Sequence, residues 1–552
     1  MPGLQEAFEA IGDAAEHHLP QTHAAGIALG VTDHEELLGI VVRGFADVAA
    51  QLPVRPDTRF QIGSISKQFA SIVAMQEVEA GRLDLHVSIN EVLPWLELPE
   101  PFGPITLHHL LTHTSGLPIG MEEAPAGPGA AVVVRSVQPR RPPGERFHYS
   151  NAGYKLVGYA LEEVTGTPIH ELLEHRVLDP LGMRHSQASI TPESYLSTSV
   201  GYEPIFDDRP AHLNHPLGPA VRIASNTADG SIVSTVADMA TYARMLLGGG
   251  STRVGEHEVS MLPPARFGEF VEPRVDTGEE PIRYGYGIDV WTHEDGRRFL
   301  AHTGGMVGYT AHLIVDRDSG LGVIALQNGG GDKEPLVRYA IEAVRASSAG
   351  MPVAPAVHPP APTQIANADE LVGTWVGERS IELQRTSDGL RLVDGALGVL
   401  LERWQIHPPH TGVAFLVPHP TWDRHLLRVV RDVDGTIREL THGPSRFVPA
   451  GRELPAPPPL PEAWSAYPGL YRSNDPWSPT LRVFAREGRL WMEIPTYGTE
   501  EPLRPVDDGW FESEDPEGLE WVPARLRFDD EMHGRAMSVE FDGARMYRSF
   551  ED

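Results

Sequence analysis

The sequence predicts a multi-domain protein: an α/β domain, built as an antiparallel sheet flanked by helices plus a helical subdomain, followed by two small antiparallel β-barrel-like domains. Three observations predict this fold class: a length of 552 residues, two Pro/Ala-rich stretches, and strand-like runs at both ends of the first long segment. Single hydrophobic cores stop growing at about 250–300 residues. We therefore expect the chain to divide into several domains.

The Pro/Ala-rich stretches begin at Ser347 and Ala450 and have the composition of extended linkers. After each stretch a similar start, ELVGTWVGE or AYPGLYRSN, leads into short segments of alternating polarity. This repeat predicts two β-rich modules of related design. The predicted divisions are a first domain at 1–348, linkers at 349–368 and 451–463, and β-barrel-like domains at 369–450 and 464–552.

The ends of the first domain are predicted to share one sheet. A helix is expected at 4–18 and a closing helix at 334–346. Strand-like runs follow the first helix and precede the last, and this pattern favours an antiparallel sheet formed by both ends of the domain. In between, apolar residues recur at spacings of three and four and predict helices at 66–81, 154–166 and 234–249.

Composition excludes several classes of function. A formal charge of −31 would repel nucleic acid, and no basic stretch offsets it. No apolar run approaches the ~20 residues of a membrane span, and the acidic N-terminal stretch does not resemble a secretory signal, so we expect a soluble, cytoplasmic protein. The absence of cysteine excludes thiolate chemistry. Neither His108–His109 nor the HLNH of 212–215 has the spacing of a metal site, so no metal or other cofactor is expected.

The segment FQIGSISKQFA carries a candidate nucleophile and base. It places Ser64 at the entrance of a helix, with Lys67 three residues later on the same face. Lysine can accept the serine proton if desolvation or nearby positive charge lowers its pKa. The chain has only three lysines, Lys67, Lys155 and Lys333, because arginine replaces lysine almost everywhere. The pattern predicts an activated serine, although an N-cap serine followed by a surface lysine would read the same way.

Two further motifs supply polar groups later in the chain. In FHYSNAGYKLVG, Tyr149 can relay a proton and Asn151 can orient a lysine or a substrate amide. In HTGGMVG, His302 can form hydrogen bonds and the glycines allow close approach of a backbone. Taken singly, the first segment is more typical of a helix cap with a packing tyrosine, and the second is more typical of a simple β-turn.

The order of the three motifs identifies a family resemblance. Ser-x-x-Lys, Tyr-Ser-Asn and His-Thr-Gly resemble the active-site motifs of the penicillin-recognising serine enzymes. The segments LHHLLTHTSGLP, PLGMRHS, DGSIVSTVADMATYARMLL and YGYG resemble the branch that contains class C β-lactamases, D-alanyl-D-alanine carboxypeptidases, D-aminopeptidases and related esterases. The resemblance spans about the first 345 residues. The histidine in the third motif and the two C-terminal modules are most similar to three-domain D-aminopeptidases.

The resemblance implies a role for each motif residue. Ser64 would be acylated, Lys67 would act as general base, and Tyr149 would protonate the leaving group and help to activate water. Asn151 would hold the substrate. An alternative, in which His113 of the THTSG segment is a histidine base, is disfavoured because that turn is structural in the family.

The resemblance also implies where a substrate lies. The oxyanion hole would combine the backbone N–H of Ser64 with that of Gly305 or Met306, and His302, Gly304 and Gly305 would border the substrate. His302 stands where β-lactamases and carboxypeptidases usually carry lysine, and a neutral histidine cannot serve as a permanent anchor for a carboxylate.

Another charge would then have to recognise the substrate. The segment PTYGTEEPLRP at 495–505 has the composition of an exposed loop, and its acids Glu500 and Glu501 could pair with a substrate ammonium. The resemblance to D-aminopeptidases implies an inserted loop of this kind, and the alternative, which fits either residue taken alone better, is two solvated glutamates on a hairpin.

Several functions remain open at this point. The leading hypothesis is a D-stereospecific aminopeptidase or amidase; the alternatives are a broad carboxylesterase, a D,D-carboxypeptidase or β-lactamase, and a non-enzymatic ligand-binding sensor. The expected partner is a small peptide, amide or ester substrate. The sequence leaves the oligomeric state open, with a homodimer as one alternative.

Overall fold

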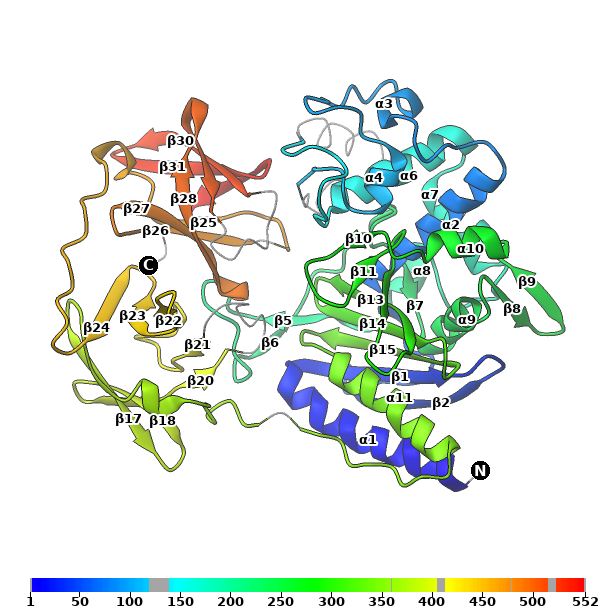
Figure 1. The fold of residues 1–552 in the computed structure, drawn as a ribbon, viewed down its shortest axis with the longest axis horizontal. Helices are drawn as coiled ribbons and strands as arrows, with labels where there is room; N and C mark the ends of the chain where they lie inside the picture. The colour runs from blue at the N-terminus through cyan, green and yellow to red at the C-terminus, as the bar shows by residue number, and fades with distance from the viewer. Residues whose placement is uncertain are drawn as a thin grey trace. The chain divides into compact units, whose positions relative to one another are not determined.

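The computed structural model describes residues 2–118, 139–358, 360–404, 413–477, 479–514 and 523–550. Contacts divide the chain into two compact units (Figure 1). The first unit comprises Met1–Glu203 and Leu217–Val357, and the second comprises Pro204–Pro216 and His358–Asp552. Within the described ranges, every helix is too short or too polar to cross a bilayer.

A nine-stranded antiparallel sheet organises the first unit. Its strand order is β10-β11-β12-β13-β14-β15-β1-β2-β3. β1 pairs with β2 on one side and with β15 on the other, so the two ends of the unit meet in one sheet, as the sequence predicts. The strands are β1 (Ala24–Thr32), β2 (Leu37–Asp47), β3 (Leu52–Pro53), β10 (Val275–Asp276), β11 (Arg283–Tyr284), β12 (Asp289–Thr292), β13 (Arg298–Met306), β14 (Tyr309–Asp316) and β15 (Leu321–Gly329).

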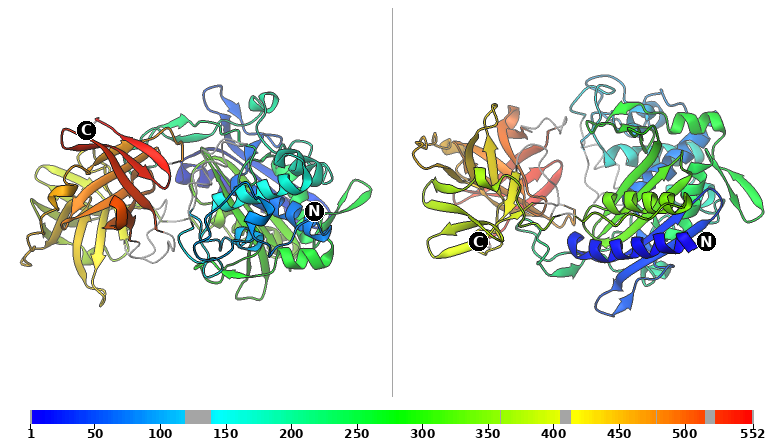
Figure 2. Two further views of the ribbon diagram at one scale, coloured as in Figure 1. Left: turned by 90° about the horizontal axis from the view of Figure 1, so that it is seen from above. Right: turned by 60° about the horizontal axis from the view of Figure 1, so that its bottom comes forward.

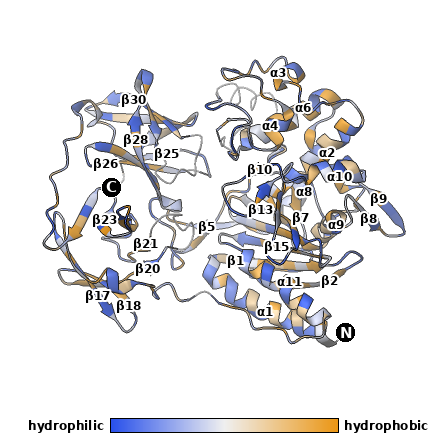
Figure 3. Ribbon diagram, in the orientation of Figure 1, coloured by the Kyte–Doolittle hydropathy of each residue, from blue (hydrophilic) through white to orange (hydrophobic). Residues whose placement is uncertain are grey.

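Two helices from the ends of this unit cover one face of the sheet. α1 (Pro2–Thr22) and α11 (Glu334–Ser348) lie side by side across it (Figures 1 and 2). Apolar residues of α11 recur every three or four positions, so one stripe faces the strands, as the hydropathy colouring shows (Figure 3). Ile11, Val323 and Ile341 belong to the resulting core and are almost fully buried.

The remaining helices include the central helix of the unit. α2 (Ser66–Glu79) is buried around most of its circumference, which explains its weak amphipathic pattern. α9 packs against β1 and β15. The helices are α3 (Ile89–Val92), α4 (Leu107–Leu111), α6 (Asn151–Thr165), α7 (Ile169–Leu173), α8 (Pro192–Tyr195), α9 (Val236–Leu247) and α10 (Pro264–Phe270). Short strand pairs join β4 (Phe60–Gln61) to β7 (Val233–Ser234), β5 (Tyr202–Pro204) to β6 (Leu217–Pro219), and β8 (Ser251–Val254) to β9 (His257–Ser260).

The second unit contains two antiparallel β modules. The first module is a nine-stranded sheet in the order β19-β18-β17-β16-β24-β23-β22-β21-β20. The second is a closed barrel of eight strands, in which β25 pairs with both β26 and β32. Each module encloses its own apolar core.

The strands of the first module are β16 (Gly373–Val376), β17 (Ser380–Thr386), β18 (Gly389–Asp394), β19 (Leu397–Leu400), β20 (Glu402–Arg403), β21 (Val413–Leu416), β22 (Leu427–Arg431), β23 (Ile437–His442) and β24 (Ser445–Pro449). Those of the barrel are β25 (Gly469–Arg472), β26 (Thr480–Arg486), β27 (Arg489–Ile494), β28 (Thr499–Pro505), β29 (Trp510–Ser513), β30 (Arg525–Met532), β31 (Arg535–Phe541) and β32 (Ala544–Arg548).

A short segment from the predicted first domain belongs to the second unit. Within Pro204–Pro216, Arg209 pairs with Asp423 at 2.8 Å and His212 with Glu402 at 2.8 Å. Asp207 pairs with Arg472 of the barrel, so the segment contacts both modules. The predicted domain limits place this segment in 1–348, and its contacts place it in the second unit. Sequence periodicity could not show this, because the partners are more than 180 residues away.

Candidate active site

Ser64 and Lys67 meet at the start of α2. Ser64 lies in a short 3₁₀ turn, Gly63–Ile65, that runs directly into the helix. Lys67 is fully buried, and its Nζ lies 3.0 Å from Ser64 Oγ. The same Nζ donates hydrogen bonds to Asn151 Oδ1 at 2.8 Å and to the backbone oxygen of Asp229 at 2.7 Å. These two oxygens can only accept, so an uncharged Lys67 amine would keep its lone pair for the Ser64 proton.

The capping of α6 positions Asn151. Ser150 is the N-cap: its Oγ accepts from the N–H of Gly153 at 3.0 Å and donates to the carbonyl oxygen of Pro118 at 2.8 Å. A serine in this place satisfies backbone groups that the first turn leaves unpaired. The cap fixes the start of the helix at Asn151, whose side chain then reaches Lys67. Ser150 therefore caps the helix, while the functional roles of Tyr149 and Asn151 remain predictions.

Tyr149 lies beside the lysine. Its ring centroid is 4.8 Å from Lys67 Nζ, and the ring also packs against His113 with 4.2 Å between ring centroids. His113 Nδ1 accepts from the N–H of Ser150 at 3.0 Å. Burial holds the pKa of His113 well below its usual range. His113 is thus a neutral packing residue behind Tyr149, which agrees with the structural role expected for the THTSG turn.

His302, on β13, is held as a neutral imidazole. Tyr284 lies with its hydroxyl 2.9 Å from His302 Nε2, and the Nδ1 contacts the backbone oxygen of Thr303. Because a carbonyl can only accept, Nδ1 carries the proton and Nε2 accepts from Tyr284. Burial lowers the pKa of His302 to about 4. Both ring nitrogens are therefore committed inside the protein, and the side chain carries no charge near pH 7.

Glycines bring the free edge of β13 against Ser64. β12 pairs with Arg298–Ala301 of β13, and none of the described strands pairs with the following residues of β13 on that side. A Cβ on Gly63 would lie 2.6 Å from the nitrogen of Gly305, and a Cβ on Gly304 would collide with the carbonyl oxygen of Ile62. Gly63 also has a φ of 54°. Only glycine allows this approach, which places the backbone of Gly305 next to the Ser64 turn.

Met306 lies one residue further along, at the β13–β14 hairpin. Its side chain is almost fully buried, and its Sδ would be 3.4 Å from a Cβ on Gly230. The geometry therefore favours Gly305 over Met306 as the strand residue nearest to Ser64. Gly304, in contrast, serves the packing of the strand against Ile62.

The expected exposed loop at 495–505 is wrong. Residues Thr499–Pro505 form strand β28 of the barrel, with Glu500 opposite Glu493 and Glu501 opposite Met492 on β27. The Glu500 side chain is 4% exposed, and its carboxylate pairs with Arg486 at 2.5 Å and with Arg428 at 3.7 Å.

These arginines explain why Glu500 is buried in a strand and does not lie on the expected exposed loop. Arg428 comes from the neighbouring β module and Arg486 from β26, and their charges make burial of a carboxylate possible. Glu500 therefore links the two modules of the second unit. That Glu500 and Glu501 bind a substrate ammonium remains a prediction, and in Glu500 this role would compete with two guanidinium partners.

Three residues at the site were not assigned a role from the sequence. Asp229 contributes a backbone oxygen, which any residue type would offer. Tyr284 lies in the YGYG segment on β11, two strands away from His302 on β13, and only the folded sheet brings its hydroxyl to the histidine. Lys155 was marked by the scarcity of lysine alone, and its Nζ lies 3.8 Å from the carboxylate of Asp229.

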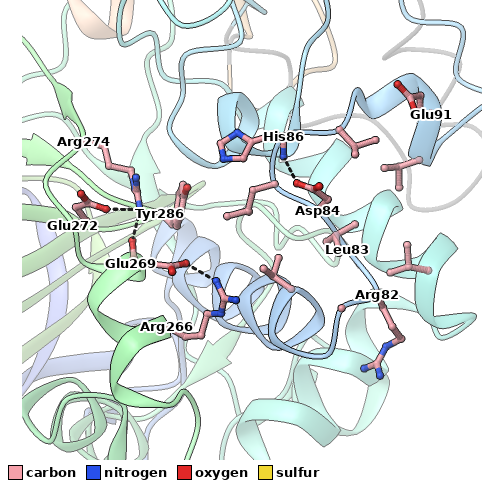
Figure 4. A pocket seen from close by; sticks show the side chains of 16 residues that line it. Arg82, Leu83, Asp84, His86, Glu91, Arg266, Glu269, Glu272, Arg274 and Tyr286 are labelled. Atoms are coloured by element: carbon pink, nitrogen blue, oxygen red, sulfur yellow. Dashed lines mark hydrogen bonds and ion pairs between the residues drawn. The ribbon is translucent and has the colours of Figure 1, made fainter.

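A separate pocket of about 950 Å³ is lined by Tyr286 of the YGYG segment together with residues of 78–92 and 266–274 (Figure 4). Tyr286 contributes to its wall and hydrogen-bonds His108 at 2.9 Å. Arg266 pairs with Glu269 and Arg274 with Glu272 at its rim. The lining of the pocket therefore combines paired charges with apolar side chains such as Leu83 and Leu85. Among the described residues, no group of three or more His, Asp or Glu is arranged to hold a metal ion.

Comparison with known proteins identifies the family. The model of the beta-lactamase family matches residues 5–346, well over half of the chain. The chain belongs to the beta-lactamase family. Penicillin-binding protein 4 of Amycolatopsis lactamdurans is 28% identical to this family member over 395 residues, covering 68% of this chain and 97% of that protein.

Solved structures share the fold of the beta-lactamase domain. A class C beta-lactamase aligns with a TM-score of 0.52 at 19% identity, covering 61% of this chain and 95% of that one. A D-stereospecific amidohydrolase from Streptomyces sp. aligns with a TM-score of 0.50 at 23% identity, covering 62% and 99%. The predicted class C β-lactamase-like fold with two further barrel-like sheets is confirmed, and the chain is a serine hydrolase of the beta-lactamase and penicillin-binding protein family.

Proposed function

We propose that this serine hydrolase is a D-stereospecific aminopeptidase or amidase that releases N-terminal D-amino acids through an acyl-enzyme on Ser64. The observation that carries the proposal is the neutral, doubly hydrogen-bonded state of His302. Carboxypeptidase and β-lactam substrates present a carboxylate to the third motif, and an uncharged imidazole with no spare nitrogen cannot hold it by charge. Substrates recognised without that anchor fit the site better.

The proposed mechanism uses the contacts around Ser64. Lys67 accepts the hydroxyl proton as Ser64 Oγ attacks the carbonyl carbon, and the N–H groups of Ser64 and Gly305 stabilise the negative oxygen. Tyr149, beside Lys67, protonates the departing amine. Water then attacks the acyl-enzyme and gives a proton to the Tyr149 phenolate, while Lys67 returns its proton to Ser64 Oγ as the acyl group leaves. Asn151 holds Lys67 in place and borders the substrate.

Fold similarity supports an amidase without specifying its substrate. The D-stereospecific amidohydrolase shows that this fold can accommodate hydrolysis of such amides. A sensor function is less compatible with the site, because a pure binding protein has no need for a lysine buried within 3.0 Å of a serine hydroxyl.

A carboxylesterase is the second candidate, and one observation favours it. Glu500, the acid expected to select a substrate ammonium, already pairs with two arginines. Without an acid at the acyl pocket, a neutral site would accept esters and amides with little regard for a free amine.

Hydrolysis of alanine p-nitroanilides would test the proposal. Free D-alanine anilide should react at least about tenfold faster than the L isomer and than the N-acetylated D compound, a discrimination of about 1.4 kcal/mol. Equal rates on free and acetylated anilides, together with faster cleavage of p-nitrophenyl esters, would favour the esterase. A fluorophosphonate should label one serine, and the label should disappear in Ser64→Ala. Labelling that persists there would contradict the whole assignment.

A further inference from the structure

The two oxygen atoms that hold Lys67 are tied together by a buried ion pair. Lys155 follows Asn151 by four residues on α6 and so lies on the same face of the helix, one turn later. Its Nζ lies 3.8 Å from Asp229 Oδ2, with the two side chains 3% and 0% exposed. A closed ring of contacts therefore runs from Lys67 to Asn151, along one turn of α6 to Lys155, across to Asp229, and back through the Asp229 backbone oxygen to Lys67.

We infer that Lys155 and Asp229 form a positioning pair that aims the Asp229 backbone oxygen at Lys67 and balances charge beside it. The inference rests on the proposed function, in which Lys67 takes the proton of Ser64. Their side chains act through Lys67, so we call them positioning residues. This role goes beyond the three motifs that identify the family.

The nature of the pair supports a role at the site. A buried ion pair adds little to stability compared with two apolar side chains of the same volume. This chain also uses arginine for nearly all of its 45 basic residues, and the lysine at 155 is one of three exceptions. An ammonium is a compact point charge, while a guanidinium needs a wider, planar space. Burial, pairing and choice of lysine are all explained if a positive charge must fit beside Asp229.

The pair also places a positive and a negative charge next to the groups that bind Lys67. Among the described residues, the other titratable groups recorded against Lys67 are Tyr149, Tyr154, His113 and His302. Burial holds the pKa of both histidines low and that of Tyr154 high, so these three are uncharged near pH 7. Lys155 and Asp229 remain as one positive and one negative charge. Removing either one should change how readily Lys67 holds its proton, and the two removals should act in opposite directions.

The pH dependence of Ser64 acylation tests this directly. The probe is a fluorophosphonate, with the second-order labelling rate measured from about pH 5 to about pH 10. Lys155→Met leaves Asp229 negative, which favours the protonated form of Lys67. The acidic limb of the profile of labelling rate against pH should therefore move about one pH unit upward. Asp229→Asn leaves Lys155 positive and should move the limb about one pH unit downward. The double variant should return it to the wild-type position.

Ser231→Ala is a matched control, because Ser231 is buried in the same segment and its hydroxyl bonds only the backbone oxygen of Thr227 among the described contacts. Its limb should not move. Limbs that shift in the same direction in both single variants, or that stay in place, would overturn the inference. If a single variant does not fold, the double variant decides: a displaced limb in that protein is equally contradictory. Wild-type protein that fails to label at Ser64 would instead contradict the proposed function.

Discussion

Tyr284 lies with its hydroxyl 2.9 Å from Nε2 of His302, and because Nδ1 donates its proton to the backbone oxygen of Thr303, this hydroxyl donates to Nε2. The tyrosine is almost completely buried, and burial raises its pKa far above the ordinary value, so it remains a donor. The third motif consequently carries a neutral histidine at 302, where β-lactamases and carboxypeptidases are expected to carry a lysine.

Restoring that cation should restore recognition of a carboxylate. We expect His302→Lys to accelerate acylation of Ser64 by a fluorescent penicillin about tenfold, since a lysine there gains a charge-assisted contact with the drug carboxylate. Labelling rates on denaturing gels would measure this. His302→Gln keeps the site neutral and should give no gain. Equal rates for the two variants would show that charge at 302 does not govern carboxylate recognition.

Lys67→Arg should be nearly as damaging as Lys67→Met, with a loss of more than about 100-fold in fluorophosphonate labelling. Arginine keeps the positive charge but cannot give up its proton near neutral pH. Circular dichroism would confirm that both proteins are folded. An arginine variant that retained a tenth of the wild-type rate would rule out Lys67 as the base.

Gly63→Ala should separate the Ser64 turn from β13. The new Cβ would lie 2.6 Å from the nitrogen of Gly305 in a backbone with φ of 54°, so one side of the site must move. We expect labelling of Ser64 to fall at least about 100-fold, as for loss of an oxyanion donor. Gly166→Ala is the matched control, with a φ of 68° and open space around the added carbon. If both alanines behave alike, backbone strain and not the approach to Gly305 explains the loss.

Local patterns, together with the family resemblance, sufficed to propose most of the residues that the structure brings together at the candidate site. Ser64, Lys67 and Asn151 each stand at a helix start, where spacing and capping fix side-chain direction without knowledge of the rest of the fold. The contribution of Asp229 could not be predicted, because it acts through a backbone oxygen. Glu500 was misread because its segment has loop-like composition, and its two arginine partners lie elsewhere in the chain.

Glu500→Gln should weaken the second unit without affecting catalysis. It leaves Arg486, 4% exposed, without its carboxylate, and breaking such a buried pair costs about 3 kcal/mol. Urea unfolding, followed through tryptophan fluorescence, should show this loss, while Ser64 labelling stays at the wild-type rate. Asp369→Asn, which breaks an exposed pair with Arg385, should cost less than about 0.5 kcal/mol. Loss of anilide cleavage with stability intact would instead favour the substrate-binding role.

Acid should destabilise the first unit through its buried histidines. Burial lowers the pKa of His18, His148 and His302 to about 4, and that of His312 to about 3. Between about pH 6.5 and these values the unfolded chain binds more protons, so stability present above the unfolded pKa is lost as pH falls. Asp289, whose pKa burial raises to about 7, opposes this by one proton over its own range.

His312→Leu provides the measurement. Between pH 7 and about pH 5, the wild-type free energy of unfolding should fall by up to about 2 kcal/mol more than that of the variant. The reason is that the variant lacks the imidazole that takes up a proton on unfolding. Urea titrations at both pH values would show it. The exposed His257→Gln should behave as wild type. An equal fall in all three proteins would mean that His312 does not contribute to the acid sensitivity.

The capture of Pro204–Pro216 by the β modules has a consequence for biosynthesis. The ribosome delivers this segment before any of its partners, because Glu402, Asp423 and Arg472 are synthesised about 190–270 residues later. While the rest of the beta-lactamase domain is synthesised, Arg209 and His212 cannot yet pair with Asp423 and Glu402, and they stay hydrated. The second unit can therefore form only if Pro204–Pro216 is still accessible when the strands of the β modules have been synthesised. A gene shortened before the modules would leave that segment permanently without its binding partners.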